Sequence, residues 1–487
     1  MSQHSPSYSY DSLNDVFNIA NRKGKMQKKY LSKEYLDAAQ EYRKMRKELN
    51  DILRKKKELR KITEEERIEE LRVEMSENAK KQKTLLQMHL TTVSSKILSG
   101  KFRFTLTPDA SKDPRKPLYI LGNTPEQYFA MQVLCRNVKK LFKISMSGRD
   151  EILSQLKMLL KEDKHRYYII RTDVQHCFES IPHDQLFGYL ESNSLLDIKS
   201  KSLLHGLIRK EFEAKNLRPE VKTPNTGVPR GCAISSLLAE YYLSKIDEEL
   251  KRKFPEIVFL GRYVDDMVLV IHPDIAELNQ KNIDKYVNEI SNLYKAKGLT
   301  IHTPSDGTGK CYIYDSESTG SLKFEFLGYG IMSVKDNPDK QGHFSLAKKK
   351  EDKIKGRIKK TFAKFNDLLD TSTYDIAAHY LFDALHVLTC NISLYNAKKG
   401  VKVGIYYSNQ LLDNEKNIKG LDCYLRYCCS TISLAGKKVI EDGKHAMLEA
   451  TLKKQLLQVS FKDGFSAPHK RYKISKDRLK TIKQSWV

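Results

Sequence analysis

The chain of 487 residues carries a formal net charge of +25, and 30% of its residues are charged. It has no run of about 18 or more apolar residues, which excludes a predicted transmembrane helix, and its first residues lack the pattern of a secretory signal. The eight cysteines show no paired CxxC spacing, so we expect free thiols and a cytoplasmic protein. So basic a chain favours a polyanionic partner, nucleic acid before a membrane surface.

The N-terminal region is expected to be helical. Residues 1–20 are interpreted as a flexible lead-in, whereas residues 28–98 are dense in charge and poor in glycine and proline. Apolar residues there recur at helical spacing, as in Tyr42, Met45 and Leu49. The charged stretch RKKKELRKITEEER breaks this spacing, so we expect two or three packed helices rather than one coiled coil. Residues 1–100 are therefore predicted to be a basic helical region.

The middle of the chain mixes predicted strands and helices, and the part from residue 345 onward is basic and mostly helical. The expected elements, in chain order, are a strand in 101–109, helices in 126–163, a strand at 167–170, a helix from Pro182, helices over 194–216 and 237–254, a hairpin at 256–271, a helix over 276–298 and short strands up to residue 332. This order predicts an α+β fold whose sheet has helices on one face.

Three aspartates stand at the ends of predicted strands. Asp173 ends the strand at 167–170, and Asp265 and Asp266 occupy the tip of the hairpin GRYVDDMVLV. If the strands are neighbours the carboxylates converge, and they cannot all stay ionised without compensation. Two Mg²⁺ ions, or Mn²⁺ in their place, supply it and can assist nucleotidyl transfer. The alternatives stay open, since Asp pairs are common in turns and Asp173 alone suits a helix cap.

Four segments resemble the successive palm motifs of reverse transcriptases. In chain order they are IIRTDVQHCFESIPH, TGVPRGCAISSLLAEYYLSKID, RYVDDMVLVI and FEFLGYGI. The resemblance covers about residues 100–345 and is to bacterial enzymes of the group II intron, retron and defence-associated lineage. The segments RDEILSQLKMLLKEDKHRYYIIRTD and LTCNISLYNAKKGVKVGIYYSN are similar to those of the defence-associated, or abortive-infection ("unknown group"), branch.

The resemblance implies a right-hand polymerase fold. Its fingers and palm would occupy residues 101–345, after the helical region 1–100. A mostly α-helical thumb and C-terminal domain would occupy residues 346–487.

The resemblance also implies a catalytic site. Asp173 and Asp265 would ligate both metal ions with the backbone carbonyl of Val174, and Asp266 would support them. Phe178 falls at the position of the family's steric gate, where a ring crowds a ribose 2′-hydroxyl and favours deoxynucleotides. A plain core aromatic is the alternative for Phe178.

Other motif positions would contact nucleotide, template or primer. Pro229 and Gly231 match the loop beside the nascent base pair, and Arg230 departs from the glutamine common in intron-type enzymes, offering a charged fork for a phosphate or base edge. Tyr263 matches an aromatic near the primer–template end, and Lys310 is a candidate for the lysine near the leaving pyrophosphate. The primer grip would comprise Phe326, Leu327 and Gly328, with core packing as the rival for Phe326.

The sequence thus predicts an RNA-directed DNA polymerase that uses dNTPs and releases a DNA product. The resemblance implies a structured non-coding RNA partner, anti-phage defence and a homo-oligomer. One alternative is a protein-primed or template-relaxed polymerase that makes repetitive single-stranded DNA. Its candidate primers, for which structural roles are favoured, are Tyr8, Tyr10, Tyr406 and Tyr407. A non-catalytic RNA-binding scaffold is the other.

Overall fold

The computed structural model describes most of the chain. The described residues are 7–59, 65–110, 117–162, 165–192, 196–216, 225–273, 282–318, 320–333, 342–394, 401–435, 437, 439–440 and 443–486. They form two compact units. The first comprises Met1–Met146, Val174–Lys253 and Ser291–Thr300, and the second Ser147–Asp173, Phe254–Ile290 and Ile301–Val487. Each unit is built from segments that are distant in the sequence.

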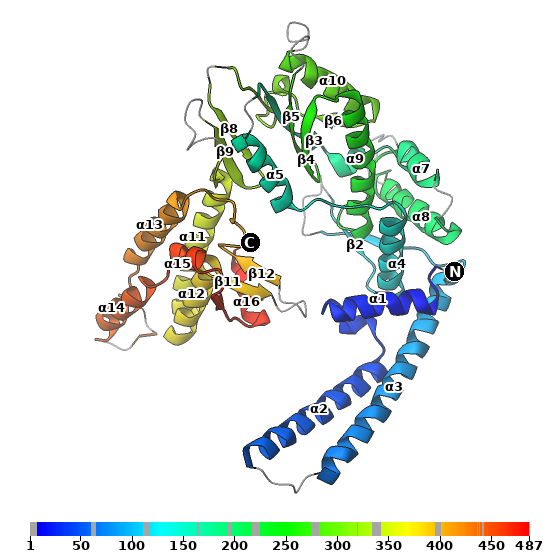
Figure 1. Ribbon diagram of the computed structural model, residues 1–487. Coiled ribbons are helices and arrows are strands. Elements are labelled where there is room, and N and C mark those ends of the chain that lie inside the picture. The colour runs from blue at the N-terminus through cyan, green and yellow to red at the C-terminus, as the bar shows by residue number, and fades with distance from the viewer. Residues whose placement is uncertain are drawn as a thin grey trace. The chain divides into compact units, whose positions relative to one another are not determined.

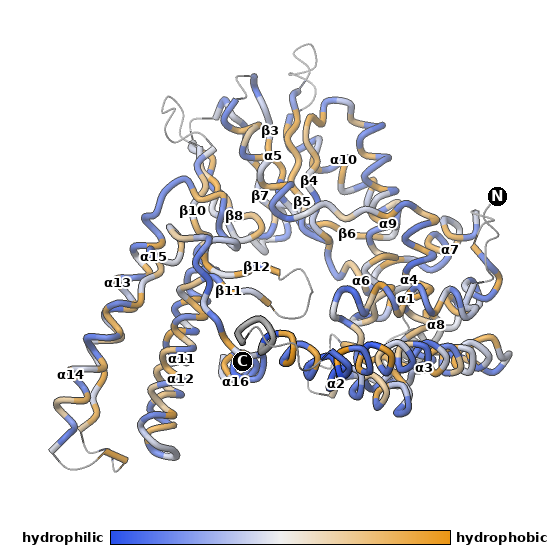
Figure 2. The backbone as a smooth tube through the Cα atoms, turned by 60° about the horizontal axis from the view of Figure 1, so that its bottom comes forward, coloured by the Kyte–Doolittle hydropathy of each residue, from blue (hydrophilic) through white to orange (hydrophobic). Residues whose placement is uncertain are grey.

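The first unit begins with helices. Its N-terminal elements are α1 (Tyr10–Arg22), α2 (Lys33–Leu59) and α3 (Glu65–Leu98). The helices α2 and α3 lie side by side (Figure 1), and in Figure 2 both are mainly hydrophilic with spaced hydrophobic turns. The expectation of packed helices in this region is therefore confirmed, although residues 1–6 and 60–64 of it lie outside the described residues.

The expectation of a flexible lead-in over residues 1–20 is wrong for residues 10–20, whereas residues 1–6 lie outside the described residues. Helix α1 begins at Tyr10, and its buried side chains are spaced three and four residues apart, at Leu13, Val16, Phe17 and Ala20. This spacing gives one apolar face. The Ser, Asn and Asp residues between these positions are typical of turns, and they made the helical pattern difficult to recognise in the sequence.

Tyr8 anchors the start of this region. Its side chain is fully buried, its hydroxyl is hydrogen-bonded to Ser200 Oγ at 2.8 Å, and its backbone carbonyl accepts from Ser94 Oγ at 2.7 Å. Burial raises the pKa of the Tyr8 phenol. The structural reading of Tyr8 is thus favoured over a role as a primer, because a priming hydroxyl must be accessible.

The rest of the first unit surrounds a long buried helix. That helix is α9 (Ala233–Lys253), and it packs against α4 (Pro125–Leu141), α6 (Cys177–Ser180) and α7 (His183–Glu191). The unit also contains α8 (Ile198–Asn216) and a small antiparallel pair, β1 (Leu106–Pro108) with β2 (Tyr119–Leu121). The strand expected over 101–109 is therefore shorter, and its partner β2 lies in a stretch for which no strand is predicted.

A five-stranded sheet carries the aspartates, and most of it belongs to the second unit. Its strands are β3 (Tyr168–Gln175), β4 (Ile257–Tyr263), β5 (Asp266–Ile271), β6 (Thr300–Ile301) and β7 (Tyr312–Asp315). The order is β4-β5-β3-β6, and β7 also pairs with β3. Strand β3 is antiparallel to β5 and to β7. The predicted α+β class is confirmed.

One face of this sheet is covered by an apolar cluster within the second unit. Helix α5 (Arg149–Glu162) and a three-stranded sheet of β8 (Leu322–Phe326), β9 (Tyr329–Ser333) and β10 (His343–Leu346) contribute to it. Their side chains join Ile169, Val268 and Val270 of the larger sheet. Gly261 allows the close approach of α5 to β4, because a Cβ there would lie 2.7 Å from Ile152 Cγ2. Helix α10 (Ile283–Ala296) lies within the helix expected over 276–298, of which residues 276–281 are outside the described part.

The C-terminal part of the second unit has its own core. Its helices are α11 (Lys348–Thr371), α12 (Tyr374–Thr389), α13 (Lys416–Ser430), α14 (His445–Leu456), α15 (Phe461–Ser466) and α16 (Lys476–Ser485). The predicted helical character holds, with a further small sheet of β11 (Asn391–Leu394), β12 (Val401–Gly404) and β13 (Arg471–Tyr472). None of the helices in the described residues is long and apolar enough to cross a bilayer.

Candidate active site

Two predicted catalytic aspartates face each other across neighbouring strands. Asp173 on β3 pairs with Asp266 on β5 in antiparallel register, and Asp266 pairs in turn with Tyr263 on β4. Residues directly opposite in an antiparallel sheet project their side chains to the same face. Arg171, two residues before Asp173, shares that face because side chains alternate along a strand. The same face is apolar further along, where Ile169 and the apolar cluster lie.

Asp265 lies in the turn that joins β4 to β5. Tyr263 and Asp266 close this turn, which leaves Val264 and Asp265 as its two central residues. Val264 has a φ of 62°, a left-handed conformation that is costly for a β-branched residue. A positive φ at the first central position is typical of a type II′ turn. Arg262 Nη1 donates to the Val264 carbonyl at 3.1 Å, which helps to hold the strained tip.

Each of the facing carboxylates has a cationic partner. Lys310 Nζ donates to Asp173 Oδ2 at 3.3 Å, and Arg171 Nη2 donates to Asp266 Oδ1 at 3.0 Å. Burial raises the pKa of Asp266 above its usual value. The charges of Asp265 and Asp173 act in the same direction, while the Arg171 guanidinium opposes them. The site therefore concentrates negative charge in a partly buried place, with two cations that offset it.

The donor atoms suit a hard divalent cation. Asp173 Oδ1 is buried and has no hydrogen-bond partner among the described residues, so one carboxylate oxygen remains for another ligand. Carboxylate oxygens are the ligands that Mg²⁺ prefers. In the part of the chain that the structure describes, no group of three or more His, Cys, Asp or Glu side chains is arranged to hold a metal ion. The three-aspartate metal site therefore stays a prediction, carried by the facing pair and the adjacent turn.

The structure adds Arg171 to the site, which the sequence reasoning did not single out. Its guanidinium joins Asp266 to the loop after β6, because Nη1 also donates to the Lys310 carbonyl at 2.8 Å. The signal available in the sequence was its position two residues before Asp173 on a predicted strand, which puts both side chains on one face.

A cavity of about 1080 Å³ in the second unit connects several predicted residues. The carboxylates of Asp173 and Asp266 and the side chain of Lys310 line one part of it. The remainder is lined by the turn between β8 and β9 and by the basic first turns of α11, with Phe326, Leu327, Gly328, Lys348, Lys349, Lys350 and Lys353. The cavity therefore combines a carboxylate pair with a lysine-rich wall, and lysines are the residue type that contacts phosphate groups.

The predicted primer grip forms a tight hairpin turn. Phe326 pairs with Tyr329, so Leu327 and Gly328 are the central residues, with φ values of 46° and 84°. Positive φ at both positions is typical of a type I′ turn. Phe326 is 1% exposed and belongs to the apolar cluster, so its core-packing role is present. Its neighbours at the turn line the cavity.

The other predicted residues lie in the first unit. Phe178, on α6, is half-buried rather than part of the core, and its carbonyl accepts from Val228 N at 2.7 Å. Arg230 Nη1 donates to Glu179 Oε1 at 3.1 Å, so its guanidinium has a protein partner. This ion pair connects the loop that contains Pro229 to α6. Val174 follows Asp173 on β3, and its side chain is buried.

Gly231 has a structural requirement of its own. Its φ is 94°, and a Cβ there would lie 2.6 Å from the Tyr119 carbonyl oxygen. The backbone of the loop can therefore approach β2 only with glycine at this position.

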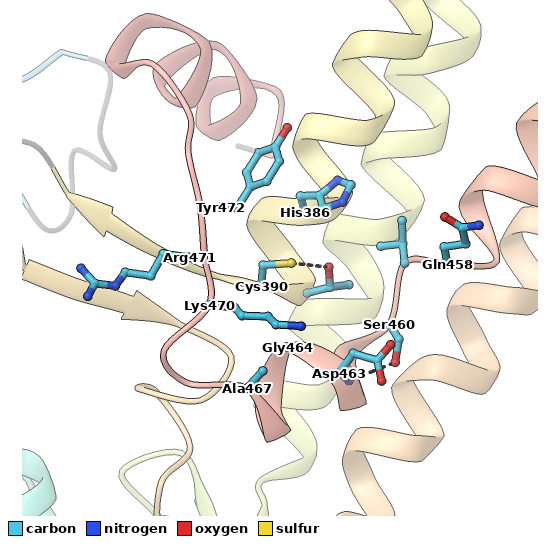
Figure 3. A pocket seen from close by; sticks show the side chains of 12 residues that line it. His386, Cys390, Gln458, Ser460, Asp463, Gly464, Ala467, Lys470, Arg471 and Tyr472 are labelled. Atoms are coloured by element: carbon cyan, nitrogen blue, oxygen red, sulfur yellow. Dashed lines mark hydrogen bonds between the residues drawn. The ribbon is translucent and has the colours of Figure 1, made fainter.

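A second cavity, of about 270 Å³, lies in the C-terminal part of the second unit (Figure 3). The His386 ring stacks on that of Tyr472 with centroids 4.6 Å apart, and Asp463 and Lys470 also line the cavity. Asp463 is the one carboxylate among its lining residues, and none of the predicted site residues is among them. Its composition does not suit two-metal chemistry.

Residues 121–331 match a family model described as "Reverse transcriptase (RNA-dependent DNA polymerase)". Over 109 residues the chain is 33% identical to an uncharacterized 91 kDa protein in the cob intron of Schizosaccharomyces pombe, covering 22% of this chain and 13% of that protein. Over 87 residues it is 32% identical to a putative COX1/OXI3 intron 2 protein of Saccharomyces cerevisiae, covering 18% and 10%. The matches thus span a small part of these relatives.

Distant likenesses to solved structures are found as well. Apo telomerase from Candida tropicalis, truncated from its C-terminal domain, has a TM-score of 0.34 at 14% identity, over 52% of this chain and 56% of that one. Telomerase from Candida albicans with a fragment of telomeric RNA has a TM-score of 0.31 at 12% identity, over 74% and 58%. The family match over residues 121–331 includes Asp173, Asp265 and Asp266, and the chain therefore contains a reverse transcriptase domain.

Proposed function

We propose that this protein is an RNA-directed DNA polymerase that joins deoxynucleoside triphosphates by metal-assisted nucleotidyl transfer. The proposal rests mainly on Asp173 and Asp266, which stand opposite each other within the reverse transcriptase domain. It is also supported by Asp173 Oδ1, which is buried and has no hydrogen-bond partner among the described residues. A decayed scaffold would have no need to retain so costly an arrangement of like charges.

Divalent metal ions, two Mg²⁺ or alternatively Mn²⁺, would be held by Asp173, Asp265 and Asp266, with the Val174 carbonyl. Bound there, they would supply activation of a 3′-hydroxyl and stabilisation of a leaving pyrophosphate. The basic side chains of the protein would bind the phosphate groups of the substrate. The exposed lysines Lys348, Lys349 and Lys353 of α11 line the same cavity and suit contacts with phosphate groups of template and primer.

The proposal is tested by nucleotide incorporation. Purified protein with Mg²⁺, dNTPs and a primed RNA template should extend the primer, and the double variant Asp265→Ala/Asp266→Ala should lose extension. Asp284→Ala is the matched control, because it removes an exposed carboxylate from α10. Full primer extension by the double variant, or an equal loss of extension in the control variant, would contradict the proposal.

The finer proposals concern the biological setting. We propose a structured non-coding RNA partner, a role in anti-phage defence, a cytoplasmic location and a homo-oligomer. Their support is the resemblance of the motifs to defence-associated reverse transcriptases and the net charge of +25. Sequencing of nucleic acid that co-purifies with the protein tests the first. Phage challenge of cells that carry the wild type or the Asp265→Ala/Asp266→Ala variant tests the second, which requires protection by the wild type alone.

The alternative of template-relaxed synthesis is separated from the main proposal by its product. DNA whose sequence tracks an added RNA template, and whose synthesis stops after RNase treatment, supports templated polymerisation. Repetitive DNA that forms regardless of RNA supports the alternative. A product covalently attached to the protein would indicate priming by a hydroxyl such as that of Tyr10 or Tyr406.

A further inference from the structure

A chain of polar contacts leads from the loop after β6 to the catalytic aspartate. The loop runs from His302 to Lys310 in the second unit. His302 Nδ1 lies 2.6 Å from Asp306 Oδ2, and His302 Nε2 lies 3.3 Å from Lys310 Nζ. Lys310 Nζ in turn donates to Asp173 Oδ2 at 3.3 Å. The four residues therefore form a series: Asp306, His302, Lys310 and Asp173.

The partners of the imidazole define its tautomer. A carboxylate accepts but does not donate, so the proton of a neutral ring belongs on Nδ1, opposite Asp306. Nε2 then carries a lone pair and accepts from the Lys310 ammonium group. Thr308 Oγ1, 3.2 Å from Nδ1, lies beside the same contact. The ring thus faces Lys310 as an acceptor.

Asp306 is held in place by its own loop. Its carboxylate accepts from the backbone N–H groups of Thr303 at 3.2 Å and Thr308 at 3.0 Å, and from Thr308 Oγ1 at 2.8 Å. Hydrogen bonds from Thr308, first its backbone N–H and then its hydroxyl, keep the pKa of Asp306 well below its usual value, and the contact with His302 acts in the same direction. The carboxylate is therefore ionised and fixed before any substrate arrives.

The backbone of His302 is tied to the strand that carries the catalytic aspartate. His302 N donates to the Asp173 carbonyl at 3.0 Å, and Thr172 Oγ1 donates to the His302 carbonyl at 2.7 Å. The residue is 8% exposed. The imidazole consequently has little freedom, whereas the Lys310 side chain is 55% exposed.

An exposed lysine gains little from one ion pair, because holding its long side chain costs conformational entropy and water screens the charge. A second, buried acceptor overcomes this cost. We propose that His302, oriented by Asp306, is a positioning residue that holds the Lys310 ammonium group beside Asp173, ready for a phosphate oxygen of the incoming nucleotide. The proposal rests on the polymerase function proposed above and identifies what places its lysine.

The donor count of the ammonium group agrees with this role. Lys310 Nζ has three N–H donors, and among the described residues His302 Nε2 and Asp173 Oδ2 account for two of them. The third serves an anionic oxygen of the substrate. The arrangement gives a phosphate a fixed positive charge at the carboxylate site, rather than one that swings on a flexible chain.

The kinetic test compares two substitutions of His302. His302→Leu removes the acceptor, and we expect kcat for dNTP incorporation to fall by about 10- to 100-fold, the usual cost of a misplaced group. His302→Gln restores an acceptor near the position of Nε2 and should recover most of the loss. Ser305→Ala, in the same loop, removes a hydroxyl whose partner is Thr303 and should match the wild type. Thermal unfolding of each variant checks that the fold is retained.

A double-mutant cycle separates positioning from a structural role. Since His302 acts through Lys310, the double variant His302→Leu/Lys310→Ala should be no slower than Lys310→Ala alone. Multiplied losses would overturn the proposal, as would a His302→Leu enzyme with wild-type kcat.

A second readout does not depend on activity. The ¹⁵N spectrum of the histidine rings in metal-free protein should show His302 with a protonated Nδ1 and an unprotonated Nε2, assigned by loss of the signals in His302→Gln. Lys310→Ala should shift the Nε2 signal and leave Nδ1 near its wild-type position. An unchanged Nε2 signal overturns the proposal. Because this measurement needs no polymerisation, it decides on the contact even if the wild type fails to extend a primer.

Discussion

Asp173 on β3 and Asp266 on β5 stand directly opposite each other, and each carboxylate is bonded to a different cation. Like charges that face each other across strands destabilise a sheet. Lys310 and Arg171 offset that cost, but Asp173 Oδ1 is buried without a partner among the described residues. A divalent cation bound at this place would satisfy this oxygen and lower the repulsion between the two carboxylates.

The first prediction follows from this and concerns metal removal. Mg²⁺ that binds only the folded form should raise the free energy of unfolding of the wild type, and with it the unfolding midpoint, by up to ~2.7 kcal/mol of free energy at a concentration about 100 times its dissociation constant. Asp173→Asn should lose most of this increment, and EDTA should abolish it. Scanning fluorimetry across a Mg²⁺ titration measures the effect, with Asp284→Asn as the control. Equal increments in wild type and Asp173→Asn would contradict the site.

The second prediction concerns sugar selection by Phe178. The side chain is half-buried on α6, and a steric gate at this position would place its ring against the sugar of the incoming nucleotide. Phe178→Val should raise the efficiency of ribonucleotide use relative to deoxynucleotide use by at least about tenfold, or ~1.4 kcal/mol. Ratios of kcat/KM for matched nucleotides measure it. Phe187→Val, which shortens a half-buried ring on α7, should leave the ratio unchanged, and an unchanged ratio in Phe178→Val would assign that ring to packing.

The third prediction distinguishes two roles for Arg230. The guanidinium is bonded to Glu179, the neighbour of Phe178, and such a partly exposed pair contributes about 0–1 kcal/mol to stability. If the pair holds the loop against α6, Arg230→Gln and Glu179→Gln should change nucleotide selection to the same extent. If Arg230 instead binds a phosphate, Arg230→Gln alone should weaken template binding and reduce its salt dependence. We expect equal effects, measured by the same kcat/KM ratios and by template binding at several salt concentrations.

Features whose geometry is determined by a local sequence pattern could be predicted from the sequence alone. The hairpin with Asp265 and Asp266 follows from two apolar runs separated by a short turn, and Asp173 follows from its place at the end of a predicted strand. To predict that these carboxylates face each other, the order of the strands in the sheet must be known as well. That order was inferred from the resemblance of the successive motifs to those of reverse transcriptases. The positive φ of Val264 could not be predicted, because a β-branched residue is among the least suited to that conformation.

The contacts that support the site could not be read from the sequence. Lys310 reaches Asp173 and His302 bonds to Thr172 across more than a hundred residues, so these pairs exist only once β6 and β7 have joined β3. Helix α1 was missed because its apolar positions stand among turn-forming residues. The small sheet of β11, β12 and β13 was missed because its strands are short and one of them, β13, is a parallel addition from far along the chain.

The fourth prediction concerns Lys350, on the lysine-rich wall of the cavity. Its Nζ donates to the Ser408 carbonyl at 2.8 Å and to Asn409 Oδ1 at 2.6 Å, and it lies 5.3 Å from the centre of the Tyr329 ring. Burial lowers the pKa of this amine from 10.5 to about 8, and the neighbouring Arg149 charge acts in the same direction. The charged amine is therefore costly in the folded protein at neutral pH.

The direction of the pH effect follows from proton binding. Between about pH 8 and pH 10.5 the unfolded chain holds the Lys350 proton while the folded protein releases it, so the contribution of this residue to stability rises with pH across that window, by at most ~1.4 kcal/mol per pH unit. Below about pH 8 its unfavourable contribution is constant. The stability of Lys350→Met, which keeps the length of the side chain without the amine, should therefore be highest relative to the wild type at neutral pH and should fall relative to it as the pH rises. Unfolding midpoints of the two proteins, measured in parallel from about pH 7 to about pH 10, give the difference in stability as a function of pH.

The control is Lys353→Met, which removes an exposed amine from the same helix and should follow the wild type at every pH. Parallel curves for wild type and Lys350→Met would show that the amine keeps an ordinary pKa, and its contacts with Ser408 and Asn409 would then fully compensate its burial.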